Sequence, residues 1–420
     1  MNFPRYAEYK DSGVEWLGEV PEHWGVVQFR RIFRLLTEKT DRRIFPVALE
    51  NIVSWSGQYI ATETKFEGEG VAFDVGDILF GKLRPYLAKA LLADQAGEAV
   101  GDFHVLRSTA DMDGRFALHQ ILNREFISIV DGSTFGSKMP RVGWDFMGGL
   151  PLAIPPCREQ STIAAFLDRE TTKIDALVAE QEKLIALLKE KRQAVISHAV
   201  TKGLNPDAPM KDSGVEWLGE VPEHWGVVPF YNVISERNES NNGMIENNLL
   251  SLSFGRIIKK DITSNDGLLP ESFETYQIIR PGDIVLRLTD LQNDKRSLRS
   301  AIVEQTGIIT SAYLAVIPFS INHLYAAFLL RSYDLMKVFY SMGGGLRQSM
   351  KFSDIKRLPT LQPPKKEQSS IAAYLDRETA KLDTLTTEAQ RAIDLLKERR
   401  SALISAAVTG KIDVRGLVVV

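Results

Sequence analysis

The stretch Glu159-Gln-Ser-Thr-Ile-Ala-Ala-Phe-Leu-Asp-Arg-Glu170 decides the fold, because the chain contains it twice. It returns as Glu367-Gln-Ser-Ser-Ile-Ala-Ala-Tyr-Leu-Asp-Arg-Glu378. Each copy follows a Pro-Pro pair, before which the chain must be extended. Each copy also opens a long helical pattern without Gly or Pro until Gly203 or Gly410, the expected C-caps. Two matching helices of this length predict a chain built as two similar halves.

The composition of the 420 residues is that of an ordinary soluble globular protein, with 44% hydrophobic and 25% charged residues. The formal net charge of −3 gives no global signal for nucleic-acid binding, so any such surface must be a local patch. No apolar run is long enough to span a membrane, and the N-terminus lacks the apolar core of a signal peptide. The single cysteine, Cys157, excludes a disulfide framework and favours a reducing cytoplasm.

A second repeat, here called the tag, precedes the variable part of each half. Lys10-Asp-Ser-Gly-Val-Glu-Trp-Leu-Gly-Glu-Val-Pro-Glu-His-Trp-Gly-Val-Val27 recurs without a change at Lys211–Val228. Its acidic, Gly- and Pro-bounded sequence does not suit phosphate contacts. The tryptophans are therefore expected to pack each domain against the end of a long helix, or to present one patch twice to two copies of a partner. Recent duplication alone would also explain the identity. The residues concerned are Trp16, Trp24, Trp217 and Trp225.

The order of tag, variable region and helix predicts an α+β protein with an internal pseudo-twofold repeat. The variable regions differ but share landmarks, such as Gly76-Asp-Ile and Gly282-Asp-Ile, each a turn followed by a short apolar run typical of a buried strand. Two similar domains with mixed β-sheets are therefore expected, separated by two long helices. The expected boundaries are 1–155 for the first domain, 156–203 for the first helix, 204–210 for a linker, 211–363 for the second domain, 364–411 for the second helix and 412–420 for the tail.

Mostly apolar residues recur every four and three positions along both helical patterns, which is typical of a coiled coil. In a parallel pair, Glu170 would face Glu378 and Lys191 would face Arg399, which are like-charged pairs. An antiparallel pair places each carboxylate opposite a basic residue, so the pattern predicts an antiparallel coiled coil about 54 Å long, at 1.5 Å of rise per residue. The alternative is that these four charges point sideways into solvent.

Catalytic and metal-binding motifs are not evident in the sequence. Gly76-Asp-Ile-Leu-Phe-Gly-Lys-Leu83 has the spacing of a phosphate-binding loop, but Leu83 replaces the Ser or Thr that must meet magnesium. The six histidines have no metal-ligand spacing, and Cys157 cannot complete a site. Scattered carboxylates could still form a nuclease site, although nothing in the sequence marks one.

Basic clusters remain as candidate DNA contacts, and both halves place them at corresponding positions. They follow the Gly-Asp-Ile landmark and lie in a Gly-rich loop near the end of each variable region. Basic loops on a rigid sheet suit phosphate contacts and base reading, although ordinary solvated loops have a similar composition. The candidates are Lys82, Arg84, Tyr86 and Lys89; Lys138 and Arg141; Arg287, Lys295, Arg296 and Arg299; and Arg347, Gln348 and Lys351.

The chain resembles the specificity subunits of type I restriction-modification enzymes over essentially its whole length. The tag with its copy, the segment Gly76-Asp-Ile-Leu-Phe-Gly-Lys-Leu-Arg-Pro-Tyr-Leu87, and the segments that run from Pro155 and Pro363 into the helices carry the resemblance, in the family's order. The second half departs from it with Leu286-Arg-Leu-Thr-Asp-Leu-Gln-Asn293, so different contacts are expected there.

This resemblance implies a non-catalytic subunit whose two target-recognition domains each read half of a split site in double-stranded DNA. It implies two modification subunits, which bind S-adenosylmethionine and methylate adenine, and restriction subunits that use ATP and Mg, with no cofactor in this chain. Since the variable regions differ, the half-sites should differ. A ~54 Å spacer limits their centres to roughly 16 base pairs apart.

Two other classes of function compete with this interpretation. One is a single-chain nuclease or methyltransferase with fused recognition domains, which would act on DNA without partners. The other is a coiled-coil interaction protein that binds no DNA. Assays of methyl transfer and of duplex binding distinguish these classes.

Overall fold

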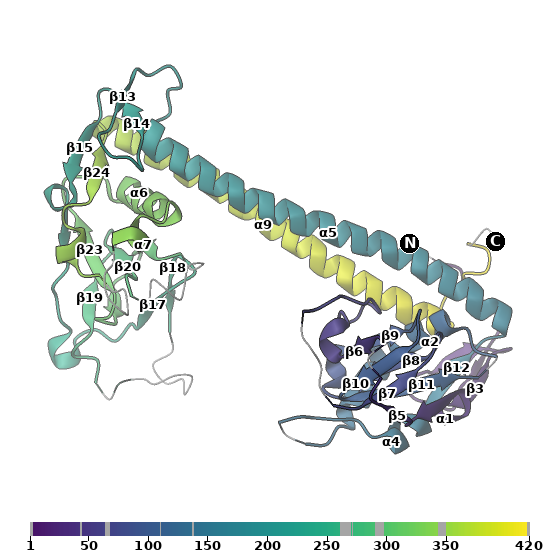
Figure 1. Cartoon of the computed structure of the whole chain (residues 1–420). Helices are drawn as coiled ribbons and strands as arrows, with labels where there is room; N and C mark the ends of the chain where they lie inside the picture. Colours follow the sequence, from purple (N-terminus) through teal and green to yellow (C-terminus); the bar gives the residue numbers. More distant parts are fainter. Residues whose placement is uncertain are drawn as a thin grey trace. The chain divides into compact units, whose positions relative to one another are not determined.

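The chain divides into two compact units in the computed structural model, which describes residues 3–42, 44–63, 68–109, 111–136, 138–260, 270, 272–289, 298–342 and 350–417. Unit 1 comprises Met1–Glu182 with Gln390–Val420, and unit 2 comprises Lys183–Ala389. The boundaries fall inside the two long helices, α5 (Cys157–Lys202) and α9 (Lys365–Val408) (Figure 1). Each unit therefore contains one variable region and part of both helices, which differs from the sequence-order division expected above.

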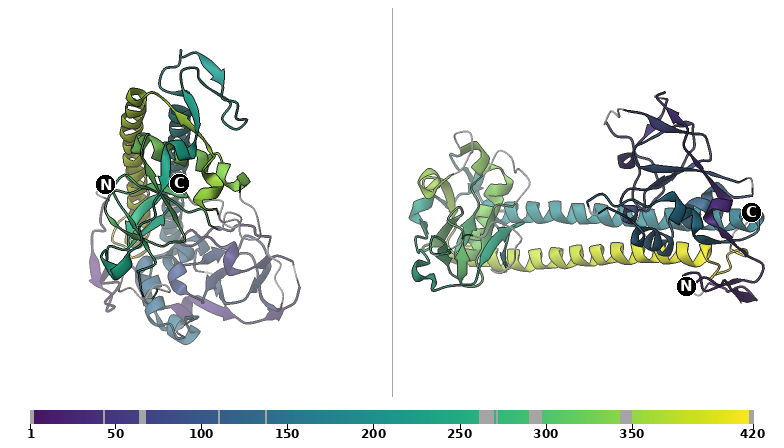
Figure 2. Two further views of the ribbon diagram at one scale, coloured as in Figure 1. Left: turned by 90° about the vertical axis from the view of Figure 1, so that its left-hand side faces the viewer. Right: turned by 90° about the horizontal axis from the view of Figure 1, so that it is seen from below.

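The two helices run antiparallel within each unit, as the charge pattern predicts. In unit 1, Ile163 near the start of α5 shares a core with Leu403 near the end of α9. In unit 2, Val200 at the end of α5 shares a core with Ile371 near the start of α9. The start of each helix thus lies beside the end of the other (Figure 2).

The apolar seam differs in detail from the heptad pattern. Leu177 in unit 1 and Leu184 and Leu385 in unit 2 fall on the expected seam, yet they are 51%, 42% and 47% exposed. Ile196 and Ile393, which lie off the expected seam, are buried. A straight helix has 3.6 residues per turn and drifts about 20° per heptad relative to a 3.5-residue repeat, so the buried stripe leaves the heptad positions along these helices.

Ion pairs join the two helices, but through other residues than those expected. Arg400 Nε lies 2.9 Å from Asp175 Oδ1 in unit 1, and Arg192 Nε lies 3.2 Å from Asp383 Oδ1 in unit 2. These pairs are equivalent in the repeat, because Asp175 corresponds to Asp383 and Arg192 to Arg400. Both pairs require antiparallel helices.

The expected pairs of Glu170 with Arg399 and of Lys191 with Glu378 are replaced by contacts within each helix. Glu170 binds Lys173 at 2.9 Å, and Glu378 binds Lys381 at 2.8 Å, which lowers the pKa of both carboxyls. Lys191 and Arg399 are exposed, as in the solvent-facing alternative. In each pair that forms, the inward-facing basic residue lies one position beyond the expected one, and its acidic partner lies five positions beyond the expected one.

Unit 1 is built on two four-stranded sheets. In one sheet, ordered β5-β7-β10-β6, the pairing of β10 with β6 is parallel and the others are antiparallel, so the sheet is mixed. The other, ordered β4-β11-β8-β9, is antiparallel. Short helices follow β11. The bounds are β4 (Phe33–Leu36), β5 (Lys39–Thr40), β6 (Pro46–Val47), β7 (Gly70–Phe73), β8 (Ile78–Gly81), β9 (Ala90–Leu92), β10 (Gly97–Val100), β11 (Phe103–Ser108), α1 (Phe29–Ile32), α2 (Gly114–Ile121), α3 (Arg124–Gly132) and α4 (Trp144–Gly149).

Unit 2 repeats the antiparallel four-stranded sheet, ordered β16-β23-β20-β21, and adds the two-stranded pairs β17-β18 and β19-β22. As expected, the Gly-Asp-Ile landmark is followed by a buried strand in both units, β8 and β20. The bounds are β16 (Ile234–Glu236), β17 (Leu250–Ser253), β18 (Arg256–Lys259), β19 (Gln277–Ile279), β20 (Ile284–Leu286), β21 (Ser300–Ile302), β22 (Gly307–Ile309), β23 (Leu314–Pro318), α6 (His323–Leu335), α7 (Val338–Met342) and α8 (Phe352–Ile355).

The tag forms a hairpin and then a strand that pairs with the chain just before the long helix. In unit 1, β1 (Tyr9–Asp11) pairs with β2 (Glu19–Pro21), and β3 (Gly25–Gln28) pairs with β12 (Pro151–Ile154). In unit 2 the same roles fall to β13 (Met210–Asp212), β14 (Glu220–Pro222), β15 (Gly226–Pro229) and β24 (Pro359–Gln362). Identical sequence thus gives identical local structure twice.

The tag of unit 1 joins the start of α5 to the end of α9. The buried Trp24 Nε1 donates to Glu159 Oε1 at 3.1 Å, and His23 Nε2 lies 2.8 Å from Glu159 Oε2. Lys411, just beyond α9, donates to the backbone carbonyl of Leu17 at 2.9 Å. Gly410, at φ +74°, is close enough to Trp24 that an added Cβ would lie 3.3 Å from the indole.

The tag of unit 2 makes the reciprocal connection. His224 Nε2 lies 2.8 Å from Glu367 Oε2 at the start of α9, and Lys202 at the end of α5 donates to the carbonyl of Glu220. Trp225 is buried beside Gly203. Each tag therefore binds the first turn of one helix and the last turn of the other.

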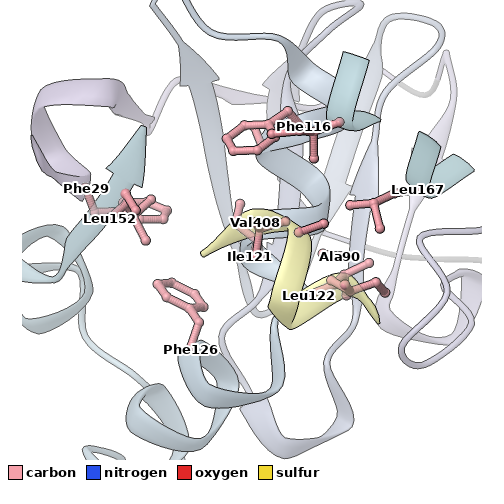
Figure 3. Packing of buried hydrophobic residues seen from close by; sticks show 14 of the residues in the cluster. Phe29, Ala90, Phe116, Ile121, Leu122, Phe126, Leu152, Leu167 and Val408 are labelled. Atoms are coloured by element: carbon pink, nitrogen blue, oxygen red, sulfur yellow. The ribbon is translucent and has the colours of Figure 1, made fainter. Parts of the chain in front are cut away.

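The main core of unit 1 lies between these elements. Phe116, Ile121 and Leu122 of the α2 region pack with Leu167 of α5 and Val408 of α9 (Figure 3). All five side chains are buried, so the two helices form part of the domain core as well as a connection.

The Asp175–Arg400 pair can be tested by charge reversal. Asp175→Arg should lower the free energy of unfolding by about 2–4 kcal/mol, because the Arg400 side chain is only 13% exposed and would face a like charge. Adding Arg400→Asp should recover most of that loss in urea unfolding of the full chain. As a control, Lys191→Glu should change stability by under about 0.5 kcal/mol. A large effect of Lys191→Glu with none from Asp175→Arg would contradict this register.

Candidate nucleic-acid interface

Two basic segments of unit 1 lie side by side and are here called the loop pair of unit 1, residues 82–89 and 132–141. Arg84 N donates to Pro140 O at 2.8 Å, and Val142 N donates to Lys82 O at 3.1 Å. Phe135 and Arg141 exchange two backbone hydrogen bonds of 3.1 Å within the Gly-rich segment. The structure therefore brings together two clusters that the sequence placed separately.

The backbone of the first segment is held in an unusual conformation. Arg84 and Ala88 have φ of 51° and 45°, left-handed values that cost a non-Gly residue about 1–2 kcal/mol each. Pro85, buried between them, begins a single 3-10 turn, Pro85–Leu87. This path leaves Arg84 and Tyr86 exposed at the surface, with Tyr86 at 47%.

Three of the basic candidates bind other groups of unit 1 through their side chains. Arg141 makes a bidentate pair with Asp102, at 2.9 and 2.8 Å, and its hydrogen bond lowers the pKa of that carboxyl. Lys82 Nζ lies 4.0 Å from the same carboxylate. Lys89 Nζ donates to Leu49 O at 2.5 Å, and burial lowers its pKa. These side chains shape the loop pair and are less available to a ligand.

Arg84 and Lys138 are the exposed basic side chains of the loop pair, and neither has a hydrogen bond or ion pair within the part of the chain that the structure describes. Sequence reasoning missed two neighbours of Lys138, Phe135 and Met139, which are 65% and 49% exposed. Large apolar side chains within a Gly-rich, basic loop are the signal that could have identified them. The loop pair thus presents cations beside exposed apolar surface.

Unit 2 repeats this arrangement in its described part. Met350 N donates to Leu288 O at 2.9 Å, as Val142 N does to Lys82 O in unit 1. Lys351 is exposed and Arg287 is half-buried with contacts of its own. Lys295, Arg296, Arg347 and Gln348 lie outside the described residues.

Arg299 does not reach the surface, which corrects its selection as a candidate DNA contact. Its side chain is fully buried, and its Nη1 donates to the carbonyls of Arg287 at 3.1 Å and Thr289 at 2.7 Å. Its Nε donates to Tyr340 Oη at 3.0 Å. A buried guanidinium needs such acceptors, and here it holds the chain after β20 in place.

Among the four tag tryptophans, Trp24 and Trp225 are buried, and Trp16 and Trp217 pack on the core of their own unit. Trp217 meets Tyr333 edge-on, with ring centroids 4.8 Å apart. The tag tryptophans are thus part of the joint between domain and helix.

The described residues meet neither the requirements for a metal site nor those for a membrane-spanning helix. No group of three His, Cys, Asp or Glu side chains in the described ranges is placed to hold a metal ion. None of the described helices is long and apolar enough to cross a membrane.

Known proteins resemble this chain in both sequence and fold, although no family model matches it. Over 216 residues it is 22% identical to the EcoDI type I restriction enzyme specificity subunit of Escherichia coli, a match covering 49% of this chain and 46% of that protein. Over 292 residues it is 25% identical to the MjaVIII type I restriction enzyme specificity subunit of Methanocaldococcus jannaschii, covering 64% of each. The matches thus span about half to two-thirds of these curated relatives.

Solved structures show the same fold at 17% identity. A chain from a structure of type I R-M system complex assembly and conformational transition superposes with a TM-score of 0.71, covering 93% of this chain and 98% of that chain. The HsdS subunit from Thermoanaerobacter tengcongensis superposes with a TM-score of 0.51 and the same coverage. The chain is thus similar in sequence to two type I restriction enzyme specificity subunits, and it shares the fold of solved type I R-M system chains.

Proposed function

We propose that the chain is the DNA-recognition subunit of a type I restriction-modification complex and that it reads an asymmetric, bipartite site in double-stranded DNA. The observation that carries this proposal is the loop pair of unit 1, one backbone hydrogen bond of which recurs in the described part of unit 2. In unit 1 it presents Arg84 and Lys138 with Tyr86 and Phe135. Guanidinium and ammonium groups suit phosphates and guanine edges, and aromatic rings pack against bases or thymine methyls.

The recognition domains in this proposal are 1–155 and 211–363, the helices 156–203 and 364–411 separate them, 204–210 is a linker and 412–420 a tail. Lys82, Arg141 and Lys89 support the loop pair of unit 1, and Lys351 and Arg287 belong to its counterpart in unit 2. Contacts from Lys295, Arg296, Arg347 and Gln348 remain a prediction from sequence. Each domain would read one half-site.

The partners in this proposal are two modification subunits and restriction subunits, acting with the chain in the cytoplasm. Exposed leucines on the long helices support such docking: Leu177 and Leu395 in unit 1, at 51% and 56%, and Leu187 in unit 2, at 52%. Apolar side chains on a helix surface are suited to burial against another chain. S-adenosylmethionine, ATP and Mg would be bound by those partners, and catalysis would occur there.

Removing the two exposed cations of unit 1 should weaken DNA binding through lost phosphate contacts. For Arg84→Ala with Lys138→Ala, anisotropy on a mixed-sequence duplex, measured with the modification subunit present, should show several-fold weaker binding. The slope of log affinity against log salt should become shallower by about 2, since each phosphate contact contributes about 0.9. Lys183→Ala with Lys189→Ala on α5 is the matched control and should change neither value. An unchanged slope in the loop variant would contradict the proposed interface.

Mapping methylated adenines in a host that carries the system should give two half-sites of different sequence. A chimera in which residues 28–153 also replace 229–361 should convert the site into an inverted repeat, because the antiparallel helices attach both domains in the same way. The unaltered chain provides the comparison. A palindromic site for the unaltered chain, or an asymmetric one for the chimera, would refute the assignment of one half-site to each domain.

A further inference from the structure

Unit 2 contains a cavity of about 620 Å³ between the β17–β18 turn, α6 and the adjoining parts of α5 and α9. Three arginines line it: Arg192 from α5, Arg256 from the start of β18 and Arg331 from α6. Phe328 and Ile196 contribute apolar wall. Figure 1 shows these elements gathered in unit 2. Cavities of roughly 300–1,000 Å³ hold small molecules in other proteins.

In unit 1, the position that corresponds to this cavity is occupied by side chains and backbone of the turn at Trp55. Arg400, the equivalent of Arg192, donates to Asp175 at 2.9 Å and to the carbonyl of Trp55 at 2.9 Å, and the Trp55 ring packs on the core. In unit 2 the matching turn carries Phe254, which has the same left-handed backbone but is 84% exposed. The two turns therefore share a conformation but differ in what they cover.

Substitutions on α6 open the cavity and add charge to it. The helices α2 and α6 align by their N-caps, since Asp113 N and Asn322 N bind the equivalent glutamines at 2.9 and 2.7 Å. This alignment matches Leu118 with Ala327 and Leu122 with Arg331. The residue after the turn glycine changes likewise, from Gln58 to Arg256. Unit 2 thus gains two guanidinium groups where unit 1 has a leucine and a glutamine.

These guanidinium groups are incompletely neutralised. Arg331 donates to Gly255 O at 2.8 Å, to Ser300 O and to Ser300 Oγ at 3.2 Å, all neutral acceptors. Burial, together with the nearby Arg192 and Arg256, lowers the pKa of Arg331 to about 10, and the nearby Asp334 carboxylate acts in the opposite direction.

The carboxylate of Asp383 forms ion pairs with two of the arginines. It lies 3.2 Å from Arg192 and 3.4 Å from Arg256. The buried Arg192 Nε still makes no hydrogen bond of good geometry within the described residues. Asp376 and Glu304 are the other acidic side chains of the lining. The lining thus holds three arginines and three carboxylates, and the hydrogen bonds of Arg331 given above go to neutral acceptors.

We propose that this cavity binds a small phosphate-bearing anion, held by Arg192, Arg256 and Arg331, with any organic part against Phe328 and beneath Phe254. Planar guanidinium groups match phosphate oxygens in pairs, and a partly desolvated site strengthens such charge-assisted hydrogen bonds. The site is distinct from the DNA surface proposed above, because none of its lining residues belongs to the loops at 287–289 or 350–351.

Isothermal titration of the full chain with inorganic phosphate and, separately, with adenosine monophosphate tests this site. Binding of either probe supports it, and comparison of the two tells whether the free ion or an organic phosphate is preferred. Arg256→Gln with Arg331→Leu restores the residues of unit 1, and the double variant should bind at least about tenfold more weakly while unfolding at an unchanged urea concentration. Arg256→Gln alone alters an exposed side chain and should give a smaller loss without affecting folding.

The matched control is Arg84→Ala with Lys138→Ala, which removes two cations elsewhere and should leave probe binding unchanged. Absence of heat with both probes at millimolar concentration would overturn the proposal. Equal binding by Arg256→Gln and by the unaltered chain would do so as well. Displacement of the probe by a short DNA duplex would assign the arginines to the DNA surface and also refute a separate small-ligand site.

Discussion

The carboxylate of Glu159, at the start of α5, is buried and accepts hydrogen bonds from Tyr6 at 2.6 Å and Trp24 at 3.1 Å. A buried carboxylate is tolerated only when such donors satisfy it, so the tag must lie against this helix turn. The same indole lies against Gly410, which follows α9 at a left-handed φ. One side chain therefore fixes the start of one helix and the end of the other, although they are far apart in sequence. The antiparallel arrangement of unit 1 depends on this joint.

The second tag makes a corresponding joint with the helices exchanged, through His224 and Glu367, although Trp225 Nε1 has no hydrogen-bond partner among the described residues. The helix charges follow the same exchange. Asp175 binds Arg400 in unit 1, and Asp383 binds Arg192 in unit 2. What surrounds each pair differs. In unit 1, Arg400 also donates to the carbonyl of Trp55. In unit 2, Asp383 also binds Arg256, and the pair lies at an open cavity. Identical frames have thus acquired different environments at equivalent positions, at the arginine cavity as well as at the loop pairs.

The repeats in the sequence predict the main features of the fold, including two long antiparallel helices and two β-sheet domains, because identical residues form the same strands and helix ends in both units. They do not predict which side chains point inward. Glu170 and Asp175 are both acidic residues of α5, and only packing decides that Asp175 meets the other helix. Arg84 and Arg299 both belong to basic segments beyond a Gly-Asp-Ile strand. Arg84 projects from a strained turn, and Arg299 is buried because neighbouring carbonyls need a donor, which no sequence pattern records.

In the loop pair of unit 1, the backbone path at the strained turn of Arg84 does not depend on the exposed side chains. Its left-handed backbone is held by Pro85, which is buried, and by the hydrogen bond from Arg84 N to Pro140 O, neither of which involves the Arg84 guanidinium. Asp102 likewise holds the second segment through Arg141. Side chains that project from such a path can change without moving the backbone, because the strain is balanced by contacts beneath it. Under the proposed function, a frame of this kind would allow new bases to be read by replacing exposed side chains, while the tags and helices stay constant.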